Sequence, residues 1–593
     1  MPDATASLRS RLMATGVPVL CGLGYALLML AATWGLWWCA LPAIAPLAWC
    51  AWRPGARPVR DGLLVAAGTL PYWALTQSWV REISEFGYPP MVLALALLGG
   101  MFVALLAFVR RWIPGVACGL AAPALWTGIE CARGEWIVGG YAWGFVAHPL
   151  IDSPGAALMA SKGGVYLVSA FVAMLVGMGF DTARTWRVSG RVPVLALAAM
   201  ALMTAVFLVP DLRRTPAGRS VRVAAVQTNI PQSLKMDWGI AEEVRDMRRF
   251  EELTRAAAAT GAEFIAWPET MMPGITLEPD AIERMDRAGL GFNDETSGAF
   301  VEAAWFAERL ARLSAEVRVP LLVGEEAREG FRIVEARGGL RMPYDRRYNS
   351  VYMLVDGALS ATRYDKVRLT PFGEVMPFVH RWPALQQRVL DFGARGMVFD
   401  LRAGRDLTVF DVPAASGAVR VVTPICFEVT DAALCRRMVF AGGQRRADLI
   451  VNVTNDGWFG DNDAGKAQHL LLARWRSAEL GTPMVRAANT GISALIDARG
   501  RVVAQGVDGE RRRTNVDGVL AGELLLGEGA TLYARVGDVA GWVAFAGAWG
   551  LLGVAGARAW KARRDGGGRG RPTPARTDPA RAGPGRTGAP RGG

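Results

Sequence analysis

The sequence predicts an α-helical membrane domain followed by an α/β layered domain. Three observations lead to this prediction. Hydrophobic residues make up 52% of the 593 residues, and they are concentrated before residue 211. Between residues 219 and 530, short apolar runs alternate with amphipathic stretches, which is typical of the strands and helices of an α/β fold. A further apolar segment, 540–560, precedes a basic C-terminus.

The N-terminal region contains seven apolar segments, most of them about long enough to cross a hydrocarbon core of ~30 Å. They span residues 17–33, 36–52, 62–79, 91–109, 116–130, 156–180 and 192–209. Together with 540–560, these segments predict a membrane bundle of eight transmembrane helices. The expected domains are a membrane domain at 1–210, an α/β domain at 219–530, an eighth span at 540–560 and a tail at 561–593. The tail is rich in Gly, Pro and Arg and is expected to be disordered, because it cannot bury a core.

Arginine placement predicts the orientation of these segments. Arginines precede the first segment and recur in every second loop, at 9–11, 53–60, 110–111 and 184–191. The intervening loops contain only Arg81 and Arg133. The positive-inside rule therefore places the N-terminus in the cytoplasm and, after seven crossings, the α/β domain outside. Glu130 and Arg133, at the outer end of the fifth segment, are consistent either with an interfacial ion pair or with contact to a lipid headgroup.

Charge and cysteine usage narrow the classes of function. The formal net charge is +12, but much of this excess lies in the tail, where residues from 561 onward carry nine Lys/Arg against two Asp. The charge of the chain therefore does not predict a nucleic-acid partner. Only Cys426 and Cys435 fall in the α/β domain, which predicts no disulfide framework. The three histidines are widely scattered, with no Cys/His cluster at metal-ligand spacing. Catalysis without a metal or cofactor is therefore expected.

The α/β domain is expected to alternate strands with helices. Strands are expected at 222–227, 263–267, 320–324, 350–355, 419–423, 449–453 and 493–496. Helices are expected at 241–259, 298–317, 428–440 and 466–480. Sites in such domains form where strands end, because several chain segments converge there.

Three chemically useful residues follow strands or extended runs in this domain. They are Glu269, Lys366 and Cys426. A carboxylate can accept the thiol proton, a thiolate can attack a carbonyl carbon, and an ammonium can stabilise the oxyanion that forms. The position of Cys426 at a strand-to-helix junction favours thiolate over thiol. Taken singly, each residue is also consistent with a plain structural role, as a buried cysteine or as a surface charge.

The motifs around these residues resemble those of the nitrilase, or carbon–nitrogen hydrolase, superfamily, and most closely its apolipoprotein N-acyltransferase family. The motifs are Trp-Pro-Glu269, Lys366 followed by Leu-Thr-Pro-Phe-Gly-Glu374, and Ile-Cys426-Phe-Glu428. Further matching stretches lie at 229–235, 455–460, 468–470, 473–474 and 486–491. The resemblance covers about residues 15–560. It implies a nitrilase-like αββα sandwich beside eight transmembrane helices.

The resemblance also implies roles for individual residues. Glu269 would be the general base, Lys366 the electrostatic stabiliser and Cys426 the nucleophile. Five further residues would support the triad or bind substrate: Glu374, Glu428, Phe427, Trp238 and Trp458. Phe427 stands where tyrosine is common, so a hydroxyl contact is absent.

The implied reaction is acyl transfer through a cysteine thioester. The donor would be a phospholipid, expected to be phosphatidylethanolamine, and the acceptor the α-amino group of a diacylglyceryl-cysteine on an apolipoprotein. The implied location is the bacterial inner membrane, with the catalytic domain on the periplasmic side. Two other hypotheses remain: a membrane-anchored amidase in which water resolves the acyl-enzyme, and a transporter or receptor without turnover.

Overall fold

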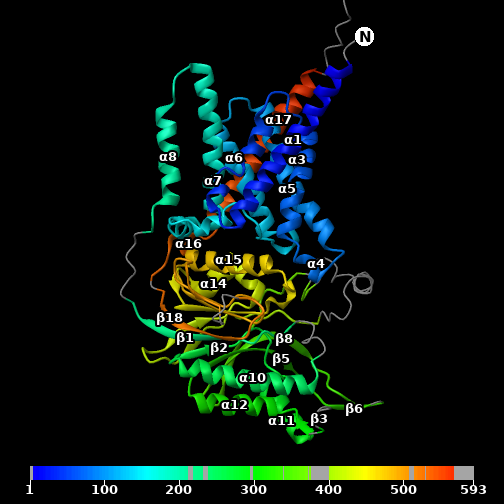
Figure 1. Ribbon diagram of the computed structural model, residues 1–593, viewed down its shortest axis with the longest axis vertical. Coiled ribbons are helices and arrows are strands. Elements are labelled where there is room, and N and C mark those ends of the chain that lie inside the picture. Colours follow the sequence, from blue (N-terminus) through cyan, green and yellow to red (C-terminus); the bar gives the residue numbers. More distant parts are fainter. Residues whose placement is uncertain are drawn as a thin grey trace, which may run out of the picture.

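The chain forms a helical region and an α/β region. The computed structural model describes residues 4–211, 218–231, 238–293, 298, 300–337, 339–371, 373–375, 400–506, 513–527 and 529–566. Figure 1 shows the helical region (residues 4–211 and 529–566) at one end and the α/β region (residues 218–527) at the other. The N-terminus and the end of α17 (Val539–Gly566) lie at the far end of the helical region.

The helical region contains several apolar helices. The principal helices before the first strand are α1 (Ala4–Thr33), α2 (Ala45–Trp52), α3 (Pro58–Thr76), α5 (Tyr88–Trp112), α6 (Cys118–Glu135), α7 (Ala156–Ser189) and α8 (Val194–Leu208). By length and composition, four of the described helices can cross a membrane, namely α1 from Thr15, α5, α7 and α17. The sequence-based count of eight transmembrane helices is therefore not confirmed.

The predicted segment 36–52 is not one continuous helix. A 3₁₀ turn, Trp37–Ala40, precedes α2, which has only eight residues. Pro42 lies between this turn and α2, and Pro46 lies in the first turn of α2, where the missing N–H breaks no helical hydrogen bond. A helix of that length extends about 12 Å, less than half of the ~30 Å hydrocarbon core.

The predicted segment 156–180 lies within α7, but the helix is broken near its start. Gly163 and Gly164 have non-helical backbone angles, and Gly164 has φ +71°, which glycine adopts without strain. The Glu479 carboxylate, from α15 (Asp463–Leu480), accepts a hydrogen bond of 2.9 Å from the Val165 N–H after the break. A side chain of the α/β region thus satisfies the backbone of a broken helix in the helical region.

Two six-stranded sheets form the α/β region. The first contains, in spatial order, β18 (Gly518–Leu525), β1 (Ser220–Gln227), β2 (Phe264–Ala266), β5 (Leu321–Glu329), β8 (Arg346–Val355) and β9 (Ala358–Asp365). The second contains β10 (Phe410–Val412), β11 (Val419–Val422), β14 (Leu449–Thr454), β15 (Met484–Ala488), β16 (Ala494–Ile496) and β17 (Val502–Gln505). Each sheet has three parallel strands at its centre. They are β1, β2 and β5 in the first sheet, and β11, β14 and β15 in the second.

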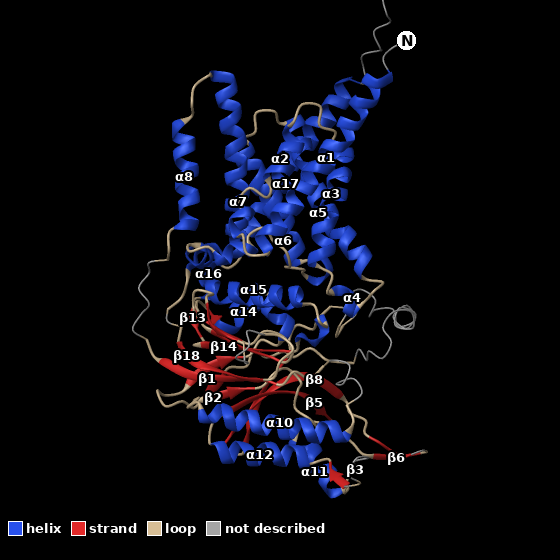
Figure 2. Ribbon diagram, viewed as in Figure 1, coloured by secondary structure: helices blue, strands red, loops and turns tan. Residues whose placement is uncertain are grey.

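Helices cover the outer faces of both sheets, as Figure 2 shows. The first sheet packs against α10 (Ile240–Ala259) and α12 (Trp305–Val317), and the second against α14 (Ala432–Val439) and α15. Successive strand residues point to opposite faces, and β1 follows this rule. Val221 and Val223 lie in the core between the sheets, whereas Ala224 and Val226 lie in the core under α10. The region is therefore an αββα sandwich, as expected.

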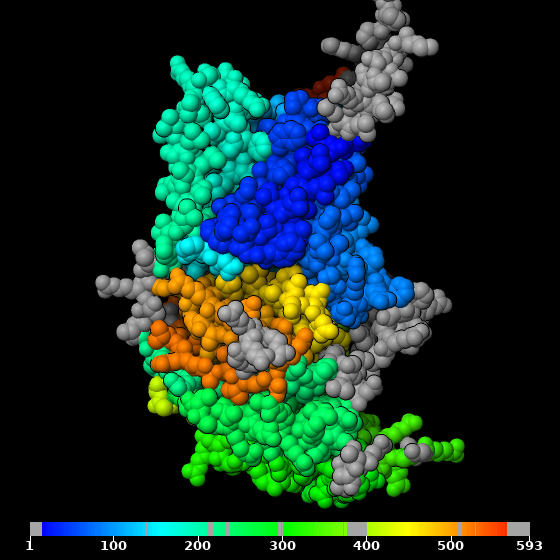
Figure 3. Space-filling model, viewed as in Figure 1, coloured from blue at the N-terminus to red at the C-terminus, as the bar shows by residue number. Residues whose placement is uncertain are grey.

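The α15 helix joins the two regions. The Trp475 indole donates to the His148 carbonyl at 3.1 Å, and the Gln468 amide donates to the Thr76 carbonyl at 2.8 Å. In Figure 3 the blue and cyan helical region rests on the yellow and orange part of the α/β region. The second sheet therefore faces the helical region, with α15 between them.

Some element boundaries differ from the prediction. The expected helix at 428–440 is a 3₁₀ helix, Cys426–Thr430, followed by α14, because Asp431 has an extended backbone and its side chain accepts from the Leu434 N–H. The expected helix at 298–317 begins only at Trp305, after the short strand β4 (Phe300–Glu302). The expected tail at 561–593 begins inside α17, and its residues 567–593 lie outside the described part.

Candidate active site

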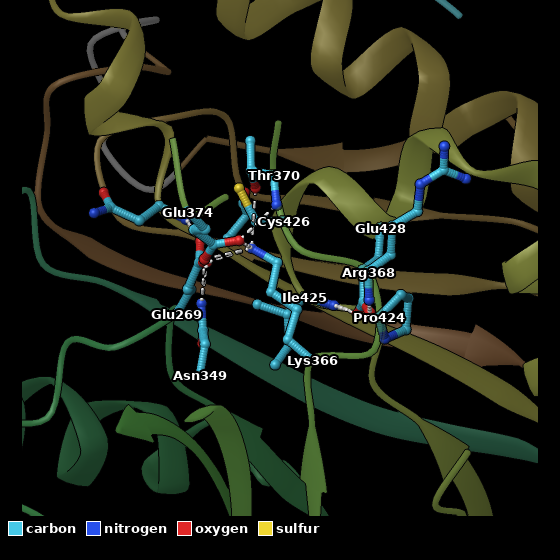
Figure 4. A network of polar contacts seen from close by, with 12 residues as sticks. Glu269, Asn349, Lys366, Arg368, Thr370, Glu374, Pro424, Ile425, Cys426 and Glu428 are labelled. Carbon is cyan, nitrogen blue, oxygen red and sulfur yellow. Dashed lines mark hydrogen bonds and ion pairs between the residues drawn. The ribbon is translucent and has the colours of Figure 1, made fainter. Parts of the chain in front are cut away.

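Three strand ends bring Glu269, Lys366 and Cys426 together. Glu269 follows β2, Lys366 follows β9 directly, and Cys426 lies four residues beyond β11. The Lys366 ammonium lies 3.3 Å from a carboxylate oxygen of Glu269. In Figure 4 these side chains and that of Glu374 converge on one place. Residues that are far apart in the sequence thus form one polar cluster.

The Lys366 ammonium is the centre of this cluster. It lies 2.8 Å from Glu374 and 3.3 Å from the Thr370 hydroxyl, and its side chain is 1% exposed. Burial disfavours the charged amine, but the carboxylates of Glu374 and Glu269 raise the pKa of Lys366 above its ordinary value. Conversely, Lys366 lowers the pKa of the buried Glu374. The raised pKa of Lys366 therefore favours an ammonium ion between these two carboxylates.

Cys426 occupies a strained turn at the start of the 3₁₀ helix. Its φ of +48° lies in the left-handed region that non-glycine residues rarely adopt. Burial and the negative charge of Glu269 raise the pKa of the Cys426 thiol, and Lys366 only partly offsets them. The expectation that the strand-to-helix junction favours the thiolate is therefore wrong. The resting side chain is a thiol, and attack on a carbonyl requires a base to remove its proton.

Glu428 holds the Lys366 loop against the Cys426 turn. Its carboxylate accepts hydrogen bonds from the backbone N–H groups of Val367 at 2.7 Å, Arg368 at 2.9 Å and Ile425 at 2.8 Å. The Tyr364 hydroxyl donates to the same carboxylate at 2.9 Å. Burial raises the pKa of Glu428 to about 7. Glu428 therefore links the segment after Lys366 to the turn that contains Cys426.

The prediction did not include Asn349, which bridges the two carboxylates. Its amide nitrogen donates to Glu269 at 2.8 Å and to Glu374 at 3.0 Å. The Asn455 N–H donates to the other oxygen of Glu269 at 2.7 Å. Asn349 lies in the polar first half of β8, beside Arg347 and Ser350, so the sequence does not mark it, and only the structure shows that it is 3% exposed. That pattern alone does not reveal its partners.

The predicted aromatic residues occupy different places. Phe427 is partly exposed, and the Arg368 guanidinium lies 6.0 Å from the centre of its ring. Trp458 is partly exposed in the 3₁₀ turn Asp456–Phe459. The Trp238 indole donates to Asp246 at 2.9 Å and packs against the core under α10. Substrate binding by these aromatic side chains stays a prediction.

The site borders the helical region. Arg368, two residues after Lys366, forms an ion pair with Asp431 and donates to the carbonyl of Gly139. Gly139 lies in the loop between α6 and α7. Within the described part of the chain, no group of three or more His, Cys, Asp or Glu residues is arranged to hold a metal ion. The cluster can therefore supply a base, a cation and a nucleophile next to the helices.

Comparison with known proteins identifies both regions. A family model described as carbon-nitrogen hydrolase matches residues 222–519, and one described as the apolipoprotein N-acyltransferase N-terminal domain matches residues 23–178. An apolipoprotein N-acyltransferase from Geobacter metallireducens is 30% identical over 536 residues, which cover 86% of this chain and 90% of that protein. One from Rhizobium meliloti is 32% identical over 473 residues, covering 76% and 77%. Among solved structures, a nitrilase-superfamily amidase from Nesterenkonia is 13% identical with a TM-score of 0.34, covering 55% of this chain and 96% of that chain.

Proposed function

Because the chain belongs to the apolipoprotein N-acyltransferase family, we propose that it transfers an acyl chain from a phospholipid to the α-amino group of an N-terminal diacylglyceryl-cysteine. The observation that carries the chemistry is the cluster of Glu269, Lys366 and Cys426 at three strand ends. Glu269 is the general base, Lys366 the electrostatic stabiliser and Cys426 the nucleophile. The reaction has two steps and requires no cofactor.

In the first step, Cys426 becomes acylated. Glu269 accepts the thiol proton while the sulfur attacks the ester carbonyl carbon, and the oxyanion lies between the Lys366 ammonium and backbone N–H groups near Cys426. The carbon–oxygen bond of the ester breaks, and the leaving alkoxide takes the proton from Glu269. A lysophospholipid departs and a thioester remains.

In the second step, the α-amino group of the diacylglyceryl-cysteine attacks the thioester carbonyl. Glu269 accepts the amine proton, the carbon–sulfur bond breaks, and the thiolate recovers that proton. The product is an amide, and the enzyme returns to its starting state. Such a covalent intermediate predicts ping-pong kinetics.

The position of the site supports lipid substrates. Arg368, two residues after Lys366, contacts the Gly139 carbonyl between α6 and α7, so the segment that carries Lys366 lies against the helical region. Acyl chains stay out of water in this arrangement, which avoids a cost of about 0.8 kcal/mol per CH₂. Phosphatidylethanolamine is the proposed donor. Glu374 and Glu428 are proposed to support the triad, and Phe427, Trp238 and Trp458 to contact substrate.

The proposed location is the bacterial inner membrane, with residues 219–530 on the periplasmic side. Residues 1–210 and 540–560 would form eight crossings, and residues 561–593 a cytoplasmic tail. The recurrence of arginines in every second loop supports this orientation by the positive-inside rule. Arg53 and Arg60 form ion pairs of 2.8 and 2.6 Å with the buried Asp61.

The proposal is tested with the full-length protein in detergent micelles. It is incubated first with a phospholipid labelled in one acyl chain, and then with a diacylglyceryl peptide. Intact mass spectrometry before the peptide is added is expected to show a hydroxylamine-labile acyl adduct, which Cys426→Ala abolishes and Cys435→Ala retains. Cys435 is the matched control because it is a buried thiol nine positions further along the chain. Release of labelled fatty acid without an N-acylated peptide would instead make the protein a hydrolase.

A further inference from the structure

A buried histidine lies behind the nucleophile. The Nε2 atom of His469, on α15, is 3.3 Å from the carbonyl oxygen of Cys426. A carbonyl oxygen only accepts hydrogen bonds, so this contact is a hydrogen bond when Nε2 carries a proton. The two residues are separated by 43 positions in the sequence.

Charged neighbours fix the imidazole ring. Its Nδ1 atom lies 3.1 Å from the guanidinium of Arg486 and 2.9 Å from the carboxylate of Asp456, and Arg486 and Asp456 form an ion pair of 2.7 Å. His469 is 2% exposed, and its two partners are fully buried. Burial and the adjacent Arg486 lower the pKa of His469, which favours a neutral ring. A neutral ring with its proton on Nε2 satisfies two of the three contacts, since Nδ1 accepts from Arg486 and Nε2 donates to Cys426. A proton on Nδ1 would satisfy only the contact with Asp456.

Two aromatic side chains pack against the imidazole ring of His469. The ring centres of Trp143 and Phe459 each lie 5.7 Å from that of His469. Trp143 belongs to the loop between α6 and α7, so the helical region contributes to the placement of this histidine. The imidazole therefore has one defined position relative to the Cys426 backbone.

The direction of the Cys426 carbonyl also sets the direction of the Phe427 N–H. A trans peptide is planar, so the carbonyl of Cys426 and the N–H of Phe427 point in opposite directions. The Phe427 N–H belongs to the first turn of a 3₁₀ helix, where N–H groups have no partner inside the helix. It is also the backbone donor that directly follows the nucleophile. Since Cys426 has φ +48°, local preference does not hold this peptide in place.

We infer that His469 is a positioning residue for acyl transfer: by holding the Cys426 carbonyl, it aims the Phe427 N–H at the oxyanion formed in both steps. This inference rests on the proposed function and deepens it. A donor directed at the oxyanion stabilises the transition state only if it is already aligned when charge develops. The negative charge then lies between Phe427 N–H on one side and Lys366 on the other.

Two conservative substitutions separate this role from a purely structural one. Glutamine can place an amide N–H where Nε2 of His469 lies, whereas asparagine can replace only the Nδ1 side. The acyl-enzyme formation rate is measured in single turnover with labelled phospholipid, together with KM and the thermal melting temperature. His469→Gln is expected to retain most of the rate. His469→Asn and His469→Ala are expected to lower it about 10- to 100-fold with little change in KM, since loss of an oxyanion donor costs about 100- to 1000-fold.

His148 provides the matched control. It is also a buried histidine, 3% exposed, and it packs against Phe145 and Trp475 without contacting Cys426. His148→Gln is expected to change melting temperature but not the acylation rate. Equal rates for the Gln and Asn variants of His469, whether both high or both low, would overturn the inference. Failure of the wild type itself to form the adduct would instead reject the proposed function.

Discussion

Replacing Glu374 by glutamine tests the electrostatic core of the site. This carboxylate lies 2.8 Å from the Lys366 ammonium and accepts hydrogen bonds from Asn349 at 3.0 Å and the Thr370 N–H at 2.8 Å. Glutamine preserves the shape but removes one of the two negative charges beside Lys366. A hydrogen bond to a charged group contributes about 1.5–3 kcal/mol. If the ammonium then moves towards Glu269 and engages the base, acyl-enzyme formation falls about 10- to 150-fold.

The assay is single-turnover acylation of Cys426, followed by mass spectrometry, with the melting temperature measured in parallel. Glu316→Gln is the control, because this carboxylate pairs with Arg255 on the surface and its side chain is 53% exposed. The control is expected to acylate at the wild-type rate. A Glu374→Gln variant that stays folded and acylates as fast as the control would show that Lys366 does not depend on this second carboxylate.

Three further predictions concern neighbouring residues. Asn349→Asp places a third carboxylate against Glu269 and Glu374, and is expected to lower the acylation rate more than about 100-fold, since like charges at this separation oppose one another. Burial raises the pKa of Glu428 from 4.5 to about 7, so the folded protein binds this proton more tightly than the unfolded chain does. Its contribution to stability is therefore full below about pH 4.5 and is lost as the pH rises to about 7, and Glu428→Gln is expected to flatten the melting temperature across that window. Gly164→Ala would place a Cβ 2.5 Å from the Tyr533 ring and is expected to lower the free energy of unfolding by about 1–3 kcal/mol, more than Gly190→Ala, which has a similar φ of +69° but open space.

The sequence predicted the location of site residues where a reactive side chain directly follows a strand pattern. Glu269, Lys366 and Cys426 each follow a strand or an extended run, and strand ends converge, so their meeting could be predicted. The motifs also placed Glu374 and Glu428 near them, and both contact the site segments. The structure agrees with these placements because a strand and its polar end are local features, whereas the roles of the residues stay predictions.

Other features of the site depend on segments that the sequence does not connect. The partners of Asn349 come from 80 positions before it and 25 after it. The neighbours of His469 include the Cys426 carbonyl, 43 positions before it, and Trp143 of the helical region. Spacing along the chain gives no measure of such contacts. The pKa of Cys426 is a second example, because desolvation in the finished fold outweighs the effect expected from its place in the sequence.

The sequence by itself determined the two-part organisation, the alternation of strands and helices, and the three residue types that the fold brings together at strand ends, because apolar periodicity and residue type are properties of short stretches. Pro42 already interrupts segment 36–52 in the sequence, whereas only the tertiary structure decided that α7 breaks at Gly163 and Gly164. The tertiary structure also decided that the thiol rests protonated and that α15 joins the two regions. Burial and electrostatic interactions depend on which distant segments pack together, and only the folded chain brings them into contact.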